Sequence, residues 1–294
     1  MRILAEADWR ARMAAHEARV DAVTAGHRAR RVAGTPHPVE DFLFTYYGWT
    51  PGRLRRWHPG AEVGLASPAA IPHVAWRFYR RQGDVVSVDV DAFLEARGDT
   101  VRFVHDLVGR TAARPGRFGC FGLHEWAMVY RLPQAEVRHS AWPLRLGQRE
   151  TDAVVEAHQI SCSHFDAYRF FTPDAAPRNV LRPTRASQAA HEQPGCLHAG
   201  MDLYKWAMKL CPVVGSDLVL DSFELAREIR ELDMRASPYD LRELGYQPVR
   251  IETPEGKSEY VEEQRRFSER SQALRARLIE AIDELLVASP ARTP

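Results

Sequence analysis

Apolar residues recur at helical spacing along much of the chain, most clearly towards the C-terminus. One stripe there consists of Tyr260, Phe267, Leu274, Leu278, Ile282 and Leu285. This spacing places the six side chains on one face of a helix, which must pack against other apolar surface. Similar patterns predict helices over residues 6–31, 197–210 and 216–234. We therefore expect a mostly α-helical protein.

The β content is expected to be small. Residues 85–90 alternate between apolar and polar side chains, which favours a short strand, and residues 159–171 fit either a strand or a helix. Shorter helices are expected over 38–48, 100–110, 123–132 and 151–157, with irregular structure over 51–72. We expect one domain over 1–294, or as the alternative an N-terminal helical lobe over 1–115 and a catalytic lobe over 116–294.

The chain carries almost no net charge, with 40 basic and 39 acidic residues. Such a balance gives no global attraction to nucleic acid, so DNA binding would need a local basic patch. The four cysteines are spaced too irregularly for a secreted disulfide framework. The first eight residues are too acidic and too poor in apolar side chains to predict a secretion signal, and no apolar run reaches the roughly 18 residues that span a membrane. We expect a cytoplasmic protein without a membrane partner.

Histidine and cysteine gather in the middle of the chain. All four cysteines and seven of the twelve histidines lie between His105 and Cys211. Metal ligands and acid–base catalysts are drawn from these residue types. The functional site is therefore expected between Gly119 and Asp240.

The first candidate motif pairs His124 with Glu125, directly after the glycine-containing segment 119–122. Adjacent residues on a helix point about 100° apart, so this pair is not the i, i+4 arrangement that holds a metal from one face. One interpretation is a general base beside a turn. The other is a capping carboxylate with a hydrogen-bonded core histidine.

The second motif contains Cys162, His164 and Asp166. If this segment is extended, the three side chains face one way, which suits a metal site or an acid–base pair. His-x-Asp also supplies two of the three ligands in one superfamily of non-haem iron dioxygenases, but those enzymes need a jelly roll that this chain does not predict. Packing of a small buried cysteine in the core is the alternative.

The third motif is Cys196, His198 and Asp202, in which His198 and Asp202 share a helix face at i, i+4. Cys-x-His is not a standard zinc spacing, so ordinary core packing is the competing interpretation. A fourth segment, 229–240, is densely charged and contains Arg230 and Arg235. These two arginines could clamp an anionic ligand, or the segment could be a solvated helix end.

An aromatic run precedes a basic segment near the N-terminus. Tyr46, Tyr47 and Trp49 are followed by arginines at 53, 55 and 56. The aromatic residues could stack on an exposed base beside a basic groove, or they could simply be core. No Walker loop, dinucleotide-binding glycine motif, nucleophile elbow or kinase signature occurs in the sequence, which argues against nucleotide-cofactor and α/β-hydrolase enzymes.

Five stretches carry a resemblance to a known family. They are residues 37–47, 119–128, 162–168, 193–198 and 233–241. In these stretches the chain resembles a bacterial family usually labelled 3-methyladenine DNA glycosylase.

The resemblance implies hydrolytic removal of an alkylated purine from DNA, without a cofactor and after the base is flipped into an aromatic pocket. The catalytic carboxylate would be Glu125, Asp166, Asp202 or Asp233. Helix-hairpin-helix glycosylases place a Leu-Pro-Gly-Val-Gly hairpin before the catalytic aspartate. The nearest segment here, 211–215, has valine in place of the first hairpin glycine.

A metal-dependent enzyme acting on a small molecule is the alternative function. His164 and Asp166, with His124 or His198, would then hold iron or zinc for a hydrolytic or oxidative reaction. We expect His124, Glu125, His164, Asp166 and His198 to converge on one cavity, since burying several ionisable groups is unfavourable unless they pair or serve a ligand. A helical binding scaffold without enzymatic activity is the third hypothesis.

Overall fold

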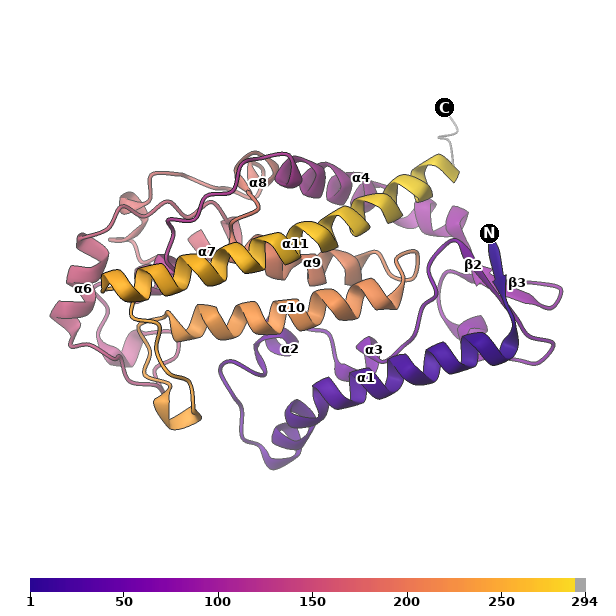
Figure 1. The fold of residues 1–294 in the computed structure, drawn as a ribbon, viewed down its shortest axis with the longest axis horizontal. Coiled ribbons are helices and arrows are strands. Elements are labelled where there is room, and N and C mark those ends of the chain that lie inside the picture. Colours follow the sequence, from indigo (N-terminus) through magenta and orange to yellow (C-terminus); the bar gives the residue numbers. More distant parts are fainter. Residues whose placement is uncertain (289–294) are drawn as a thin grey trace. The chain divides into compact units, whose positions relative to one another are not determined.

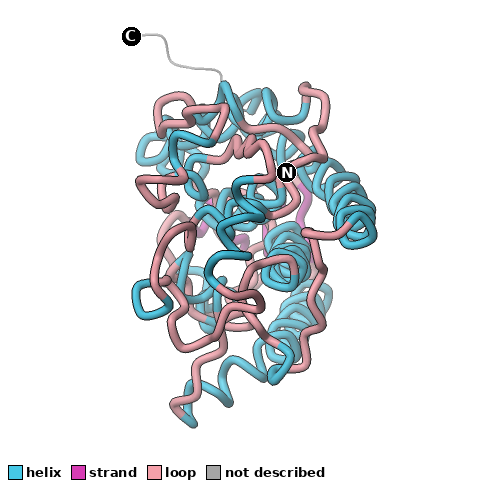
Figure 2. The backbone as a smooth tube through the Cα atoms, turned by 90° about the vertical axis from the view of Figure 1, so that its left-hand side faces the viewer, coloured by secondary structure: helices cyan, strands magenta, loops and turns pink. Residues whose placement is uncertain are grey.

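The computed structural model describes residues 1–288 of the chain. Helices hold more than half of these residues, and strands are few (Figure 2). The predicted fold class, mostly α with a small β element, is confirmed. Of the described helices, none is long and apolar enough to span a lipid bilayer.

Contacts divide the chain into two compact units. The first contains residues 1–108, 203–224 and the chain from 273 onward, and the second contains 109–202 and 225–272. Four helices pass from one unit into the other: α4 (Val90–Ala112), α9 (Leu197–Lys209), α10 (Ser216–Arg235) and α11 (Pro254–Ala288). Both units are therefore built from segments that are distant in the sequence.

The first unit contains the whole sheet. Its strands are β1 (Arg2–Leu4), β2 (Val63–Ala66), β3 (Tyr79–Gln82) and β4 (Val85–Val88), in the order β1-β2-β4-β3. β1 pairs with β2 in parallel, and the other pairs are antiparallel, with Leu65 opposite both Leu4 and Val86. Gly83 has φ +58°, which suits the tight turn between β3 and β4.

The strand predicted at 85–90 is confirmed over 85–88. The prediction of irregular structure over 51–72 is wrong in part, because this stretch contains β2 and the short helix α3 (Pro51–Leu54). β2 is only four residues long, and its pairing with β1 joins residues some sixty positions apart. Such a pairing leaves little local signal in the sequence.

The first unit contains further helices besides α3. They are α1 (Glu6–Ala33), α2 (Phe42–Tyr47) and the 3-10 turn η1 (Pro72–Ala75), with the N-terminal part of α4. α1 ends at Gly34, whose φ of +67° allows the left-handed cap. The core contains Trp9, Trp57, Leu65 and Val86, and the Trp9 indole donates to the Ala66 carbonyl at 2.9 Å.

Two predicted helices have different bounds. The helix predicted over 38–48 begins only at Phe42, after a turn that the Asp41 carboxylate stabilises by accepting from the His37 backbone amide at 2.9 Å. The helix predicted over 100–110 is part of the longer α4.

The second unit contains short elements joined by long turns. They are α5 (Leu123–Ala127), η2 (Gln134–Glu136), α6 (Gln148–Glu156), α7 (Phe165–Tyr168), η3 (Ala176–Arg178), α8 (Gln188–His191) and η4 (Arg242–Leu244). α5 is shorter than the predicted 123–132, and Arg131 adopts φ +58°, which a helix cannot include. The ambiguous segment 159–171 forms neither a regular strand nor one helix: it has one bridge, from Ile160 to Asn179, and then α7.

The stripe predicted on the last helix is largely confirmed. Five of its six side chains are buried, namely Tyr260, Phe267, Leu278, Ile282 and Leu285. Leu274 is only half-buried, and the buried position beside it is Arg275. α10 and α11 run side by side in Figure 1, and Arg277 pairs with Asp221 at 2.7 Å in the first unit while Arg270 pairs with Glu228 in the second.

Candidate metal centre

Three histidines from three separate segments of the second unit lie together. His124 is on α5, His164 directly precedes α7, and His198 is in the first turn of α9. The His198 ring centroid is 4.5 Å from that of His124 and 5.4 Å from that of His164. His198 therefore contacts both of the other rings.

Backbone geometry around α5 directs His124 inward. Phe121 and Gly122 both have positive φ, +46° and +67°, so the chain turns sharply just before the helix. The Trp126 indole then donates to the Ala236 carbonyl at 2.9 Å, which attaches α5 to the end of α10. All five residues of α5 are buried as a result.

Two local features position the segments that carry the other two histidines. Asn179 accepts from the Cys162 amide at 2.7 Å and donates to the Cys162 carbonyl at 2.9 Å, which fixes the segment leading to His164. Gly195 precedes α9, and a Cβ atom there would lie 2.5 Å from the Arg117 carbonyl oxygen. Only glycine permits this close approach, which sets the start of the helix that carries His198.

The first group of donor atoms comes from His124, His198 and Asp233, whose ligand-type atoms all lie within 4.8 Å of one another. His124 Nε2 is 2.8 Å from Asp233 Oδ1. Arg230 Nη1 donates to Asp233 Oδ2 at 2.9 Å and to Glu125 Oε1 at 3.0 Å. Arg230 and Glu125 thus orient the carboxylate of Asp233, as residues surrounding a metal ligand commonly do.

The second group comes from His164, Glu192 and Asp202, again with donor atoms within 4.8 Å of one another. His164 Nε2 lies 3.2 Å from Glu192 Oε1 and 3.3 Å from Asp202 Oδ2. Both distances are within ion-pair range, neither ring nitrogen of His164 has a hydrogen-bond partner of good geometry, and Glu192 Oε1 also accepts from Gln188 Nε2 at 2.5 Å. One imidazole nitrogen therefore faces two buried carboxylates at once.

This spacing is the one expected of metal ligands. Zinc bonds to nitrogen and oxygen are about 2.0–2.1 Å long, and the edge of a tetrahedron is about 1.6 times the distance from its centre to a corner. Ligand atoms around a tetrahedral ion are therefore about 3.3 Å apart. The two distances from His164 Nε2, 3.2 and 3.3 Å, agree with that value.

The carboxylates dominate the electrostatics of both groups. Burial by itself would lower the pKa of His164, but Glu192 and Asp202 outweigh it and raise that pKa to about 9. Burial would likewise lower the pKa of His124, and Asp233 reverses the direction. Burial would raise the pKa of Asp233, but His124, His198 and Arg230 hold it well below its usual range. The site therefore favours positive charge.

His198 differs from the other two histidines. Burial and the neighbouring His124 keep its pKa well below the usual value, so its ring is neutral and has a free lone pair. Its side chain is also partly accessible, whereas His124 and His164 are buried. Metals bind the neutral form of imidazole, so His198 can bind as it stands, whereas a metal at His164 would displace the proton of that ring.

A small cavity adjoins these rings. Its volume is about 20 Å³, which is room for one water molecule or ion. It is lined by His124 and His198 together with Cys120, Cys162 and Cys196. Burial raises the pKa of the Cys162 thiol to about 12 and that of Cys196 well above the usual value, so these thiols are protonated in the absence of a metal.

Asp166 and Arg235, both singled out in the sequence, belong to neither donor group. Asp166 pairs with Arg169 at 3.0 Å, and the hypothesis that it shares a face with His164 is wrong, because α7 begins at Phe165 and the segment is not extended. Arg235 donates to the Gln247 carbonyl and pairs with Glu259 at 3.2 Å.

Glu192 is the ligand-type residue that the sequence motifs missed. It lies in the long proline- and arginine-rich stretch 172–194, between α8 and α9, where no periodic pattern singles out any one residue. Its proximity in sequence to the segment 193–198 was the only available signal.

The aromatic candidates belong to the first unit. Tyr47 stacks on Trp49 with ring centroids 5.9 Å apart, and both rings pack edge-on against Tyr204. Tyr46 stacks on Phe42 at 5.0 Å. Both tyrosines are partly buried in these contacts, so core packing accounts for much of the aromatic run.

No protein-family model, no curated protein and no solved structure matches this chain. The resemblance to the 3-methyladenine DNA glycosylase family therefore stays a prediction. A function has to be argued from the side chains of the site.

Proposed function

We propose that this chain is a metal-dependent enzyme that activates water at the His/carboxylate cluster of its second unit. The observation that carries the proposal is that His164, Glu192 and Asp202 are buried together, with donor atoms at the spacing of metal ligands. The adjacent group of His124, His198 and Asp233 provides a second set of donors.

The donor types suggest which metals would bind. Two histidines and one carboxylate are the ligands of many catalytic zinc sites and of ferrous non-haem iron sites. A set of one histidine and two carboxylates favours zinc and ferrous iron as well, and it also suits manganese, which prefers oxygen ligands. Because His198 contacts the rings of both other histidines, the two sets together suit a pair of neighbouring ions.

The surrounding residues suit hydrolysis. A zinc ion held there would lower the pKa of its bound water to about 7 and so supply hydroxide at neutral pH. Arg230 would fix the orientation of Asp233, and the water-sized cavity beside His198 is a place for the attacking water. We propose hydrolysis of a polar bond in a small molecule as the reaction class.

The N-glycosylase function predicted from the resemblance receives less support from this geometry. A glycosylase carboxylate must face the sugar that it stabilises. Asp233 is fully buried, so a sugar could not reach its carboxylate without a change in the surrounding chain. Asp202 is also buried, and its Oδ2 faces His164.

The metal content of protein purified without an affinity tag tests the proposal. We expect at least one divalent ion per chain by elemental analysis, or after reconstitution with zinc, ferrous iron or manganese. Glu192→Gln and Asp202→Asn preserve side-chain shape and should each lower that content strongly. His105→Ala, on the surface of α4, is the matched control and should leave it unchanged.

Two results would contradict the proposal. One is a folded wild-type protein that retains less than about a tenth of an ion per chain after reconstitution, since catalytic zinc sites hold their ion tightly. The other is release of alkylated bases from duplex DNA by protein kept in chelator, which would instead support the glycosylase prediction.

A further inference from the structure

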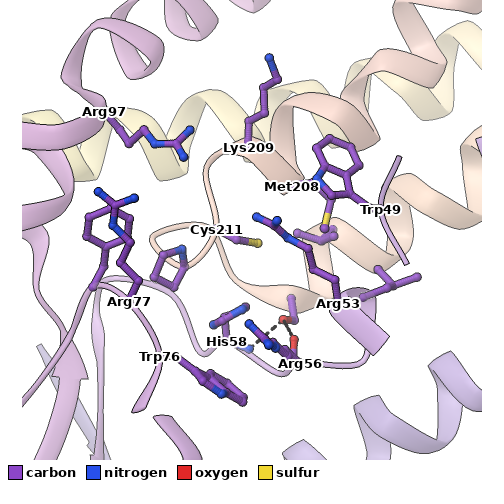
Figure 3. Close-up of a pocket in the computed structure, with 15 residues that line it drawn as sticks. Trp49, Arg53, Arg56, His58, Trp76, Arg77, Arg97, Met208, Lys209 and Cys211 are labelled. Carbon is purple, nitrogen blue, oxygen red and sulfur yellow. Dashed lines mark hydrogen bonds between the residues drawn. The ribbon is translucent and has the colours of Figure 1, made fainter. Parts of the chain in front are cut away.

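A second cavity lies wholly within the first unit (Figure 3). Its volume is about 490 Å³, within the range of pockets that bind small molecules. Its walls come from α3 and the segment after it, from residues 76–78, from α4, and from the end of α9 through the start of α10. Its residues have no part in the metal centre described above.

The lining of this pocket is strongly basic. Five cationic side chains contribute to it: Arg53, Arg56, Arg77, Arg97 and Lys209. No aspartate or glutamate lines it. In Figure 3 the guanidinium groups of Arg53 and Arg97 extend towards the middle of the pocket from opposite sides. An anion placed there would be approached by arginines from both walls.

The four arginines are not used in ion pairs. Among the described residues, no carboxylate lies within 4.0 Å of the guanidinium nitrogens of Arg53, Arg56, Arg77 or Arg97. Arg55, which lies outside the pocket, pairs with Glu17 at 2.9 Å and with Asp21 at 3.2 Å. Like charges that are gathered without counter-charges repel one another, and a multiply charged anion relieves that repulsion.

Aromatic rings lie beside these charges. Trp49 and Trp76 both line the pocket, and the Arg56 guanidinium lies over the Trp76 ring at 5.5 Å. Arginine and tryptophan together recognise a planar heterocycle attached to phosphate, because the rings stack and the guanidinium forks match phosphate oxygens. His58 also lines the pocket but carries no charge, since burial lowers its pKa to about 3.

The wall that carries Arg53 and Arg56 is fixed in place. Ser216 Oγ accepts from the His58 backbone amide at 2.8 Å and donates to the Arg56 carbonyl at 3.2 Å. His58 Nδ1 lies 3.0 Å from the Tyr79 hydroxyl. These bonds attach the segment after α3 to the start of α10 and so fix the backbone of this wall.

We propose that this pocket binds a free nucleotide, with its phosphates between Arg53 and Arg97 and its base against a tryptophan. The number of cations favours a di- or triphosphate over a monophosphate. This inference does not depend on the proposed metal centre, because it uses different residues in the other unit.

Titration calorimetry with ATP, ADP, AMP and inorganic pyrophosphate at about 50 mM salt tests it, with quenching of tryptophan fluorescence as a second readout. We expect ATP to bind with a Kd below about 100 μM, and at least ten times more tightly than AMP or pyrophosphate. Arg53→Gln and Arg97→Gln should each weaken ATP binding about tenfold or more. Arg55→Gln, whose charge lies outside the pocket, is the matched control.

Several outcomes would overturn the proposal. They are the absence of ATP binding below about 1 mM in folded protein, equal affinity for pyrophosphate and ATP, and equal effects of Arg53→Gln and Arg55→Gln. A single-stranded oligonucleotide that binds more tightly than ATP, with strong dependence on salt, would also overturn it and would assign the pocket to nucleic acid instead. Circular dichroism of each variant shows whether it has kept its fold.

Discussion

His124 Nε2 lies 2.8 Å from Asp233 Oδ1, although 109 positions separate the two residues in the sequence. Both side chains are buried, and Arg230 holds the second oxygen of Asp233. A buried carboxylate with an imidazole on one oxygen and a guanidinium on the other is expensive to disturb, because removal of one charge leaves its partners uncompensated.

Asp233→Asn is therefore expected to destabilise the protein by about 3–5 kcal/mol, the cost of breaking a buried ion pair. Urea unfolding measures this change in the free energy of unfolding. Glu228→Gln on the same helix is the control, because Glu228 pairs with Arg270 at the surface, with both side chains about half exposed. It should cost less than about 1 kcal/mol. If the two substitutions lower the free energy of unfolding equally, the buried ion pair contributes no more to stability than the surface pair.

Gly195→Ala tests the close backbone approach at the start of α9. A Cβ atom at this position would lie 2.5 Å from the Arg117 carbonyl, so the backbone must shift. We expect a loss of stability of about 1–3 kcal/mol and a lower metal content, because the segment that carries His198 moves.

Gly119→Ala is the matched control for this substitution. Nothing lies within 4 Å of the Cβ position of residue 119, so the methyl group meets no atom. Stability should change by less than about 1 kcal/mol. If Gly195→Ala is as mild as Gly119→Ala in thermal and urea unfolding, the close approach does not constrain α9.

Leu278→Ala tests the apolar stripe of α11. Leu278 is almost completely buried, so truncation leaves a cavity and should cost about 2–5 kcal/mol. Leu274, one turn earlier, is only half-buried, and Leu274→Ala should cost clearly less. A change below about 0.5 kcal/mol for Leu278→Ala in urea unfolding would show that the stripe is peripheral to the core.

Long helices could be predicted from the sequence because their signal is local and repeated. α1 and α10 have many turns, and each apolar position in them repeats the same period. β4 was predictable because three alternating valines lie within one short run. β2 was missed because its pairing with β1 depends on contacts between distant segments.

Prediction of the candidate site also failed where it depended on contacts between distant segments. The neighbourhoods of His124, His164 and His198 could be predicted from the clustering of chemically active residues. Whether His164 faces Asp166 or Asp202 depends on the backbone at one position, because α7 begins directly after His164 and turns Asp166 away. Glu192 could not be predicted, since only tertiary contacts bring its stretch of chain to the site.

The pH dependence of stability tests the neutral state of His58. Burial, with smaller contributions from His73 and Arg56, lowers the pKa of His58 to about 3 in the folded protein. The unfolded chain has a histidine pKa near 6.5, so between about pH 6.5 and pH 3 only the unfolded state binds a proton at this residue. The free energy of unfolding must therefore fall as the pH falls through this range, by about 1.4 kcal/mol per pH unit for this one group.

His58→Gln removes the titrating ring, so the variant should lose less stability than the wild type between pH 6.5 and pH 5. The other buried histidines are present in both proteins, so most of their contribution cancels in the difference. Urea unfolding at pH 8, 7, 6 and 5 provides the comparison. Above pH 7 the difference in free energy of unfolding between the two proteins should be constant. His58 of the wild type is neutral there in both the folded and the unfolded state. If the difference stays constant down to pH 5 as well, His58 takes up its proton in the folded protein too, and burial does not keep it neutral.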